Sequence, residues 1–364
     1  MVVPTENSFL PASTFYDYGG TLDYGPLVIM CINENVIRFG EVLIPSFYYL
    51  VCALCLVGNG LVLYVLLKHE DWKNITTIFV CNMATSDLVF ATSLPFWGVY
   101  HSSMWIFGRT ACKIVSSTFF IGFYSSIIFL TGIAVDRYLA VVHAVTATRS
   151  TRCAVFASVG IWSISVMLTI PEFIFTETKT DKEGGIICEY VGYHGENRYV
   201  WEFLLFLQQT VVFFLLPFVI ILFCYCSIVK TLAGCRTQRK HRALKMIFSI
   251  ILAFFLCWAP LNITILLKAL QDYGLSAFAT CKAQEILDYC LYITRNLAFF
   301  HCCLNPILYM CLGTNVRSHL RCPCFRWPVA LGSSVRLRIL SNSYAHSTKD
   351  SSGGNNPLRI STTV

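Results

Sequence analysis

Seven long apolar stretches dominate this sequence, and each is long enough to cross a lipid bilayer as a helix. A helix rises about 1.5 Å per residue, so about 20 residues span a hydrocarbon core of roughly 30 Å. Charged residues make up only 13% of the chain, whereas about 25% is usual in soluble proteins. The pattern therefore predicts an all-α membrane protein, a seven-transmembrane helix bundle. The stretches are residues 42–67, 75–98, 112–135, 153–174, 202–229, 245–267 and 289–312.

The distribution of Lys and Arg predicts the orientation of this bundle. If the N-terminus lies outside, the inner connections carry most of the basic residues, and the outer segments are net acidic. Basic inner loops are the usual pattern in membrane proteins. The net charge of +7 therefore does not indicate nucleic-acid binding. The first residues, MVVPTENSFLP, lack the basic head and apolar core of a cleavable signal peptide, so we expect the first span to direct insertion.

These features divide the chain into four expected regions of a multi-pass plasma-membrane protein. After the last span, GTNVRSHLRC is typical of a short amphipathic eighth helix, and the residues beyond it are rich in Ser and Thr. Such polar composition favours disorder. We expect an extracellular tail over 1–40, the bundle over 41–312, the eighth helix over 313–325 and a disordered cytoplasmic tail over 326–364.

Two formal charges lie deep inside the apolar stretches, Asp87 and Arg295. A charge at the bilayer centre costs roughly 2.5 to 3.5 kcal/mol even on the mildest scale, so both are expected to face the bundle interior. Arg295 is the seventh residue of its stretch, about 10 Å below the outer edge, which is the depth of a ligand pocket. Asp87 with Ser126 and Asn305 predicts a buried hub that holds a sodium ion or a proton. The alternative is a helix-to-helix hydrogen bond without an ion.

Prolines recur deep in the stretches, where each frees a backbone carbonyl and kinks its helix. Kinked helices suit a conformational switch, and they also suit a transporter. Transporter halves are often related by an internal repeat, and we find none here. Few charges line the stretches, so an ion-conducting path is disfavoured as well. The prolines are Pro95, Pro171, Pro217, Pro260 and Pro306.

Four cysteines fall on the predicted outer side: Cys31, Cys112, Cys188 and Cys281. Cysteines in an oxidising compartment favour disulfides, and four of them allow three pairings. The others lie mostly inside the stretches and are interpreted as small apolar residues. No CxxC pair or His/Cys spacing supports a zinc site. Apart from the sodium ion we expect no cofactor.

Taken in order, the motifs of the chain resemble those of a class A (rhodopsin-like) G-protein-coupled receptor over about residues 40–325. Each motif alone is weak, but the full series lies in the right spans. The motifs are Gly58–Asn59, Asp87, Cys112, Asp136–Arg137–Tyr138, Trp162, Pro217 with Tyr225, Cys257–Trp258–Ala259–Pro260 and Asn305–Pro306–Ile307–Leu308–Tyr309.

Within that class the chain most resembles the chemokine receptors. DRYLAVVHA (136–144), HCCLNPILY (301–309), WIFG (105–108) and SLPFW (93–97) are similar to stretches of that family, the last with serine in place of threonine. ITRNLAFFHCC most resembles the corresponding stretch of receptors for XC-type chemokines (lymphotactin). These receptors carry arginine at the position of Arg295, where most chemokine receptors carry glutamate. Leu261 departs from the family's usual tyrosine.

The resemblance implies a receptor without enzyme activity that binds a chemokine, with an XC-type chemokine expected. It implies signalling through inhibitory G proteins, a rise in intracellular calcium and leukocyte chemotaxis. The alternatives are a scavenger receptor that does not signal, which the intact DRYLAVVHA disfavours, and a class A receptor for another peptide. A retinal protein would need a lysine in the seventh span, where Phe299 stands.

The resemblance also assigns residues to roles. The disulfides it implies are Cys112–Cys188 and Cys31–Cys281. The ligand pocket it implies consists of Tyr48, Trp97, Phe119, Phe120, Leu261, Arg295 and Phe299. The activation switch it implies consists of Asp136, Arg137, Tyr138, Tyr225, Trp258, Pro260, Pro306 and Tyr309.

Lys240 stands where some class A receptors place an acid that latches Arg137, so Asp136 is expected to be the main restraint on that arginine. Arg295 is expected to make the pocket floor electropositive, with Asp288 or Tyr292 as its resting partner. A purely structural arginine is the alternative.

Both ends of the chain carry expected interaction sites. Acids beside tyrosines in the N-terminal tail favour sulfation, and this acidic arm would attract a basic chemokine. The residues are Tyr16, Asp17, Tyr18, Asp23 and Tyr24. At the other end, Cys322 and Cys324 lie beside basic residues and are candidates for palmitoylation. The Ser/Thr-rich tail is expected to be phosphorylated by a receptor kinase and to bind arrestin. Thr362–Val364 fits a PDZ ligand.

Overall fold

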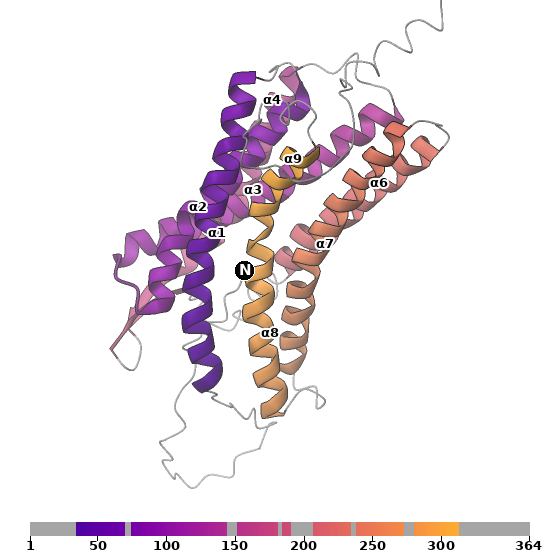
Figure 1. The fold of residues 1–364 in the computed structure, drawn as a ribbon. Coiled ribbons are helices and arrows are strands. Elements are labelled where there is room, and N and C mark those ends of the chain that lie inside the picture. The colour runs from indigo at the N-terminus through magenta and orange to yellow at the C-terminus, as the bar shows by residue number, and fades with distance from the viewer. Residues whose placement is uncertain are drawn as a thin grey trace, which may run out of the picture. The chain divides into compact units, whose positions relative to one another are not determined.

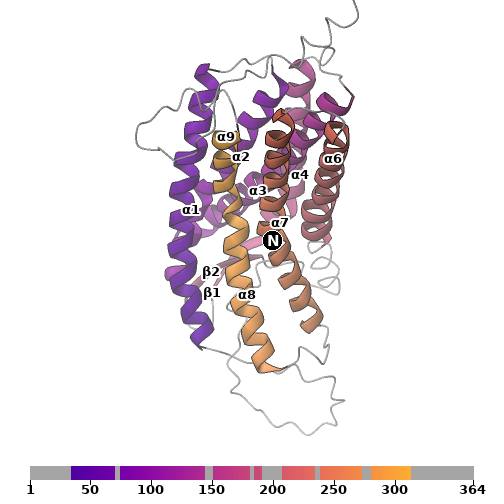
Figure 2. The same ribbon diagram turned by 45° about the vertical axis from the view of Figure 1, so that its right-hand side comes forward.

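The computed structural model describes residues 34–69, 74–143, 151–180, 184–190, 207–233, 238–272 and 280–312. The described residues up to 309 belong to one compact unit, and residues 310–312 belong to a second. In the first unit the helices run side by side as a bundle, with α1 next to α8 and α7 next to α6 (Figures 1 and 2). The predicted helical seven-transmembrane bundle is confirmed.

Among the described residues, the elements follow one another as helices with one hairpin between them. The hairpin is antiparallel and pairs Thr176 with Tyr190 and Thr180 with Ile186. The elements are α1 (Glu34–His69), α2 (Ile75–Ser102), α3 (Gly108–Val142), α4 (Thr151–Phe175), β1 (Thr176–Thr180), β2 (Ile186–Tyr190), the π-helix η2 (Gln208–Leu215), α6 (Leu216–Ala233), α7 (Gln238–Asp272), α8 (Cys281–Phe299) and α9 (His301–Leu312).

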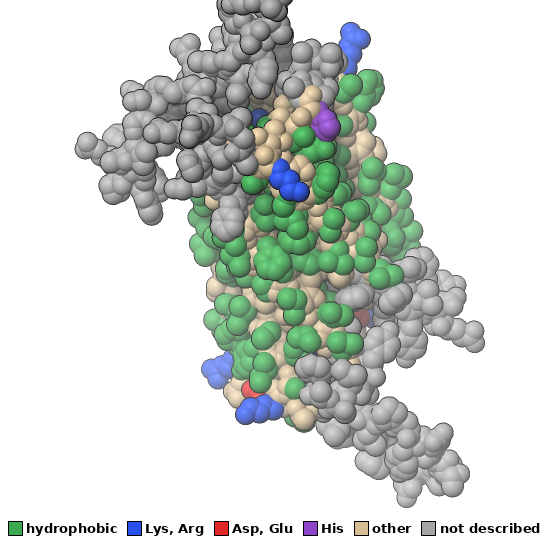
Figure 3. Space-filling model, turned by 90° about the vertical axis from the view of Figure 1, so that its right-hand side faces the viewer, with side chains coloured by type: hydrophobic (Ala, Val, Ile, Leu, Met, Phe, Trp, Pro, Cys, Tyr) green, Lys and Arg blue, Asp and Glu red, His purple; other side chains and the backbone are tan. Residues whose placement is uncertain are grey.

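Within the described residues, six helical spans are long and apolar enough to cross a membrane. They match the first six predicted stretches and lie in α1, α2, α3, α4, η2 with α6, and α7. On the face seen in Figure 3, hydrophobic side chains cover the middle of the molecule, and the described charges lie toward its two ends. This belt fits a hydrocarbon core, where polar surface is costly.

The seventh predicted stretch is divided at Phe300 into α8 and α9, and neither qualifies as a span by itself. Pro306 lacks an N–H, which leaves the carbonyl of Cys302 without its helical partner. Asn59 of α1 donates its side-chain amide to this carbonyl, with 3.2 Å between Nδ2 and the oxygen. Gly58 packs beside it, and a Cβ there would lie 3.0 Å from Pro306 Cγ. The side chain of Asn59 thereby supplies the hydrogen bond that the proline removes.

Helices α2 and α3 approach each other closely at Gly122. A Cβ at this position would lie 2.4 Å from the backbone nitrogen of Phe90, so a larger residue does not fit there. The approach brings the middle of α2, with Asp87, against Ser126, which lies one turn further along α3. Gly122 therefore sets the spacing on which the polar centre of the bundle depends.

The hairpin is joined to α3 by the Cys112–Cys188 disulfide, which the resemblance implied. Trp105 packs beside it in a small buried cluster and donates its indole N–H to the carbonyl of Gly108, at 2.8 Å. Gly108 has φ = +80°, a conformation that favours glycine. Cys281 is also disulfide-bonded. Cys31, its implied partner, lies outside the described residues.

Candidate functional site

Asp87 forms the centre of a buried polar hub in the middle of the bundle. Its side chain is 1% exposed. Ser126 donates its hydroxyl to Oδ1 at 2.5 Å, and Asn305 donates its amide to Oδ2 at 2.8 Å. The structure thus brings together α2, α3 and α9 through the three residues that were predicted to form the hub.

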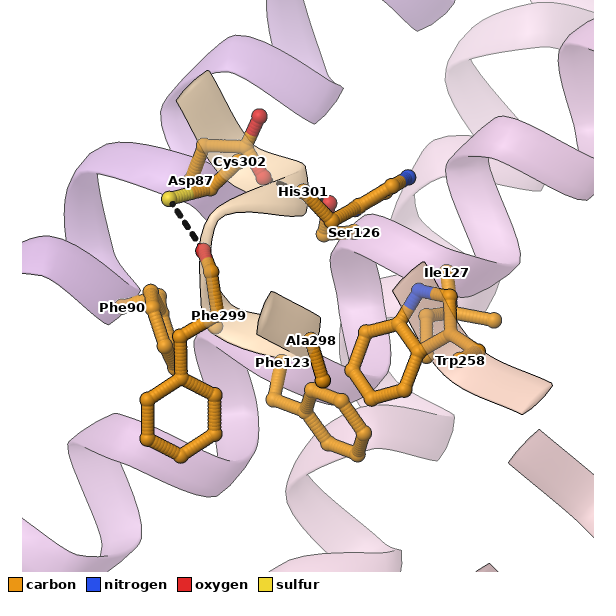
Figure 4. Close-up of a pocket in the computed structure, with 11 residues that line it drawn as sticks. Asp87, Phe90, Phe123, Ser126, Ile127, Trp258, Ala298, Phe299, His301 and Cys302 are labelled. Carbon is orange, nitrogen blue, oxygen red and sulfur yellow. Dashed lines mark hydrogen bonds between the residues drawn. The ribbon is translucent and has the colours of Figure 1, made fainter. Parts of the chain in front are cut away.

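A cavity of about 20 Å³ adjoins this hub, and about 10 to 15 Å³ is enough for one water molecule. Figure 4 shows Asp87 and Cys302 on one side of the cavity and Trp258 on the other. His301 also lines it, although only its neighbour Asn305 was assigned to the hub. The lining residues are Asp87, Phe90, Gly122, Phe123, Ser126, Ile127, Trp258, Ala298, Phe299, His301 and Cys302.

The residues at the hub do not supply a full coordination shell for a cation. Hard cations are held by about six oxygens. Here the carboxylate of Asp87 and the hydroxyl of Ser126 are the oxygens at the hub, because Asn305 presents its amide nitrogen. Gly122, one turn before Ser126, has no side chain to add. In this structure the hub is therefore a hydrogen-bonded carboxylate, and the sodium ion stays a prediction.

Trp258 connects the cavity to the helices that were expected to move. Its ring lies 4.9 Å from that of Phe123 on α3 and 5.9 Å from that of His301 on α9, measured between centroids. It belongs to α7, two residues before Pro260. A shift of this indole would therefore change the contacts of three helices at the edge of the Asp87 cavity.

The DRY motif lies at the far end of α3 from the hairpin. Thr76, at the start of α2, donates its hydroxyl to Oδ2 of Asp136 at 2.6 Å. This contact was not predicted, because nothing in the local sequence distinguishes Thr76 from other threonines. Arg137 is half-buried, and Tyr138 contacts the ring of Phe223 on α6. The side chains of Lys240 and Tyr309 lie outside the described residues.

The implied pocket residues Tyr48, Phe119 and Phe299 lie in one aromatic cluster around Phe90. The ring of Phe90 lies 4.9 Å from that of Phe119 and 5.4 Å from that of Phe299. Tyr48 completes the cluster, 5.6 Å from Phe299. Phe90 itself was not predicted, because a phenylalanine in an apolar stretch carries no distinguishing signal.

The remaining aliphatic and aromatic pocket residues are Phe120, Leu261 and Trp97. Phe120 packs between Phe119 and Tyr124, and Leu261 is fully buried in the same core. The ring of Trp97 lies 5.7 Å from that of Trp105 near the disulfide. Trp97 packs against both the small cluster at the disulfide and the main core of the bundle.

Arg295 points into the bundle, as the cost of a charge in lipid requires. It is 4% exposed, and its Nε has no hydrogen-bond partner among the described residues. Asp288, one of the two suggested resting partners, instead forms an ion pair with Lys268 of α7. Arg295 therefore keeps unused hydrogen-bonding capacity inside the protein.

A second group of charges, which was not predicted, lies where α3 meets the hairpin. Arg109 and Lys113 both bind Glu177 of β1, with N–O distances of 2.6 Å and 2.9 Å. Hydrogen bonds from Arg109 and then Lys113 lower the pKa of Glu177 to about 2. The carboxylate therefore remains charged at any physiological pH, and it ties α3 to β1 beside the disulfide.

Several predicted sites lie outside the described residues. They are the sulfation segment with Tyr16, Asp17, Tyr18, Asp23 and Tyr24, the palmitoylation candidates Cys322 and Cys324, the eighth helix over 313–325 and the PDZ segment Thr362–Val364.

Comparison with known proteins gives one consistent family. The family described as 7 transmembrane receptor (rhodopsin family) matches residues 58–309. The chain is 39% identical to human Chemokine XC receptor 1 over 319 residues, 87% of this chain and 90% of the relative. It is 37% identical to human C-C chemokine receptor type 4 over 292 residues, 80% of each. It is 35% identical to C-C chemokine receptor type 3 of Cavia porcellus over 314 residues, 85% of this chain and 84% of the relative.

Proposed function

Because the chain belongs to the chemokine receptors of the rhodopsin family, which are receptors and not enzymes, we propose that it responds to an XC-type chemokine. It does so at the plasma membrane, with its N-terminus outside. The observation that carries the proposal is the buried Arg295, whose Nε has no hydrogen-bond partner in the described structure. The similarity to Chemokine XC receptor 1 supports it.

Arg295 favours a ligand that brings an acceptor, such as a carboxylate or a carbonyl, into the bundle. A buried guanidinium with an unused donor is costly until such a group arrives. A ligand whose entering segment is purely cationic is disfavoured by like-charge repulsion. The acidic N-terminal arm would first attract the basic body of the chemokine from solution.

The signal then passes through the cavity that Trp258 and Asp87 share. Displacement of the indole disturbs its contacts with Phe123 and His301, and both residues lie beside the hub. Release of Arg137 at the end of α3 would allow an inhibitory G protein to bind, with a rise in calcium and chemotaxis as consequences. Receptor kinase, arrestin and a PDZ protein at Thr362–Val364 are the further partners that we propose.

A panel of chemokines applied to cells that express the chain tests this proposal. The readout is activation of inhibitory G proteins at measured surface expression. We expect the XC-type chemokine to be the most potent, and Arg295→Glu to reduce its potency roughly 10- to 100-fold, the range for a hydrogen bond to a charged group. A response to C-C chemokines alone, or an Arg295→Glu variant as potent as the wild type, would contradict the proposed ligand.

C-C chemokines are the second candidate ligands, since two of the relatives are C-C chemokine receptors with 35% and 37% identity. A scavenger is the other alternative. It would internalise the chemokine without activating any G protein, an outcome that the same cells can report.

A further inference from the structure

Four free cysteines lie together inside the bundle, where α1 meets the start of α9. They are Cys52 and Cys55 on α1 and Cys302 and Cys303 on α9. Each is at most 8% exposed. Their sequence context predicted small apolar residues, and neither the pocket nor the switch gives them a role. Several thiols at one junction nevertheless offer chemistry that a single buried thiol lacks, because oxidation can join two of them.

Contacts between these thiols run from one helix to the other. The thiol of Cys302 hydrogen-bonds to that of Cys55 on α1, and its sulfur lies 3.9 Å from that of Cys303. Cys303 also donates to the carbonyl of Val51 on α1, at 3.6 Å. A disulfide needs two sulfurs that can approach to about 2 Å. The thiols of Cys55 and Cys302 already interact across the junction, so they are the candidate pair.

The same two cysteines adjoin the polar hub and the kink. Cys55 donates its thiol to the backbone carbonyl of Asp87 at 3.3 Å. The amide nitrogen of Asn59 lies 3.2 Å from the sulfur of Cys55 and 3.2 Å from the carbonyl oxygen of Cys302. A bond between the two sulfurs would therefore form beside the contact that supports the kink before Pro306.

The cavity beside Asp87 gives a small molecule access to one of the thiols. Cys302 lines this cavity, where its thiol donates to the carbonyl of Phe299 at 3.1 Å (Figure 4). Buried thiols are ordinarily inert, but a thiol at a cavity wall can meet a small neutral oxidant. The cavity has room for a water molecule, and hydrogen peroxide is neutral and larger than water by only one oxygen atom.

We propose that Cys302 is an oxidation site, at which hydrogen peroxide produces a disulfide with Cys55 that links α9 to α1. The sulfur of Cys302 first attacks one peroxide oxygen, and the O–O bond breaks. The thiol proton leaves with the hydroxide as water, and a sulfenic acid remains. The sulfur of Cys55 then attacks the sulfenic sulfur, the S–O bond breaks, and a second water leaves. Two thiols thus lose two electrons and two protons, and peroxide is reduced to two water molecules.

Such a disulfide would hold the first turn of α9 against α1. Pro306 and Tyr309 of the expected switch lie further along α9, so their movement relative to α1 is restrained once the bond has formed. Cys55 would also turn from the Asp87 carbonyl toward Cys302. The oxidised receptor is therefore expected to signal less, and a dithiol reductant is expected to restore it.

Disulfide mapping by mass spectrometry tests the site without any ligand. Membranes that contain the full chain are treated with hydrogen peroxide at a dose that oxidises the exposed Cys153, and the remaining thiols are then blocked. We expect a Cys55–Cys302 disulfide in the wild type and its loss in Cys55→Ala and Cys302→Ala. Cys81→Ala, which removes a buried cysteine of α2, is the matched control and should keep the disulfide. Absence of the disulfide, or a disulfide of Cys302 with Cys303 alone, would overturn the proposal.

G-protein activation by the XC-type chemokine, added after the oxidant is removed, tests the consequence, which rests on the proposed function. The wild-type response should fall in proportion to the fraction of receptor that carries the disulfide, and it should recover after reduction. Cys55→Ala should respond equally before and after peroxide, whereas Cys81→Ala should lose its response as the wild type does. An unchanged response of fully cross-linked receptor would overturn the restraint on α9. A wild type that ignores this chemokine before oxidation contradicts the proposed ligand, and the disulfide map still decides whether the oxidation site exists.

Discussion

The two halves of the bundle differ in how many of their buried polar groups have hydrogen-bond partners. Toward the DRY motif, Asn59, Asn82, Asp87 and Asp136 all have hydrogen-bond partners. At Trp258 and on the hairpin side of it, many buried polar atoms have none among the described residues. They include Trp97 Nε1, Ser117 Oγ, Glu172 Oε1, Gln209 Nε2, Thr210 Oγ1, Trp258 Nε1, Asn262 Oδ1, Arg295 Nε and Asn296 Oδ1.

This difference distinguishes the DRY half, which transmits the signal, from the hairpin half, which binds the ligand. A fully satisfied polar network favours one arrangement of the helices, because any displacement leaves buried groups unpaired. Groups with unused capacity instead gain from atoms that arrive with a ligand. The hairpin half is therefore expected to lose affinity when its polar groups are replaced, and the DRY half is expected to lose stability.

The largest effect on stability is expected at Asp87. Asp87→Ala leaves the donors of Ser126 and Asn305 unpaired, and each unsatisfied buried group costs roughly 1 to 3 kcal/mol. We expect the free energy of unfolding to fall by about 3 kcal/mol, measured as a lower melting temperature of the purified receptor. Asp87→Asn keeps an acceptor and should fall by less. If the two variants melt together at the wild-type temperature, the hub does not hold the DRY half.

Asn59 offers a test of the same half at the kink before Pro306. Asn59→Leu removes the donor that meets the Cys302 carbonyl and leaves that carbonyl unpaired. The expected loss is roughly 1 to 3 kcal/mol in the free energy of unfolding. Asn59→Asp is the control, since it keeps the size but not the donor, and it should be at least as destabilised. A Leu variant as stable as the wild type would show that the carbonyl has another partner.

Gln209 and Gln208 are neighbours on η2 that should respond in opposite directions. Gln209→Met removes an unpartnered amide and should leave the melting temperature unchanged or slightly raised, by less than about 1 kcal/mol in the free energy of unfolding, while ligand affinity falls. Gln208→Met breaks two hydrogen bonds, to Tyr124 and Leu168, and should cost about 1 to 2 kcal/mol. Equal destabilisation of both variants would contradict the distinction between partnered and unpartnered polar groups on which the comparison of the halves depends.

The sequence predicted the arrangement of spans better than it predicted local breaks in them. Apolar length alone predicts the spans, and the cost of polar groups inside them predicts that Asp87, Ser126 and Asn305 lie together. Pro306 predicted a kink in the seventh stretch, but neither the place of the division, at Phe300, nor the hydrogen bond from Asn59, which is distant in sequence, was predicted. The π-helix before Pro217 is a similar case.

Glu172 was missed for a different reason. It lies near the end of an apolar stretch, where an acid is expected to face water. Its burial follows from the rotation of α4 against α3, which is set by packing between helices. The same applies to Glu177, whose partners Arg109 and Lys113 are brought to it by the folding of the hairpin against α3.

The smallest expected effect concerns the ion pairs of Glu177, which join the hairpin to α3. Its pKa of about 2 lies below the ordinary value of 4.5, so the carboxylate binds protons less readily in the folded protein than in the unfolded chain. Its contribution to stability is therefore fully present above about pH 4.5 and is lost as the pH falls through about 2. Since this group is partly exposed to water, the contribution is small and decreases with added salt.

Glu177→Gln should therefore lower the melting temperature slightly at pH 7 and not at pH 2, and the difference at pH 7 should shrink at high salt. Melting curves of the two proteins across this pH range, at low and high salt, measure it. Glu189→Gln on β2 is the matched control for loss of one hairpin acid. If Glu177→Gln lowers the melting temperature as much at pH 2 as at pH 7, the packing of this side chain, and not its charge, joins the hairpin to α3.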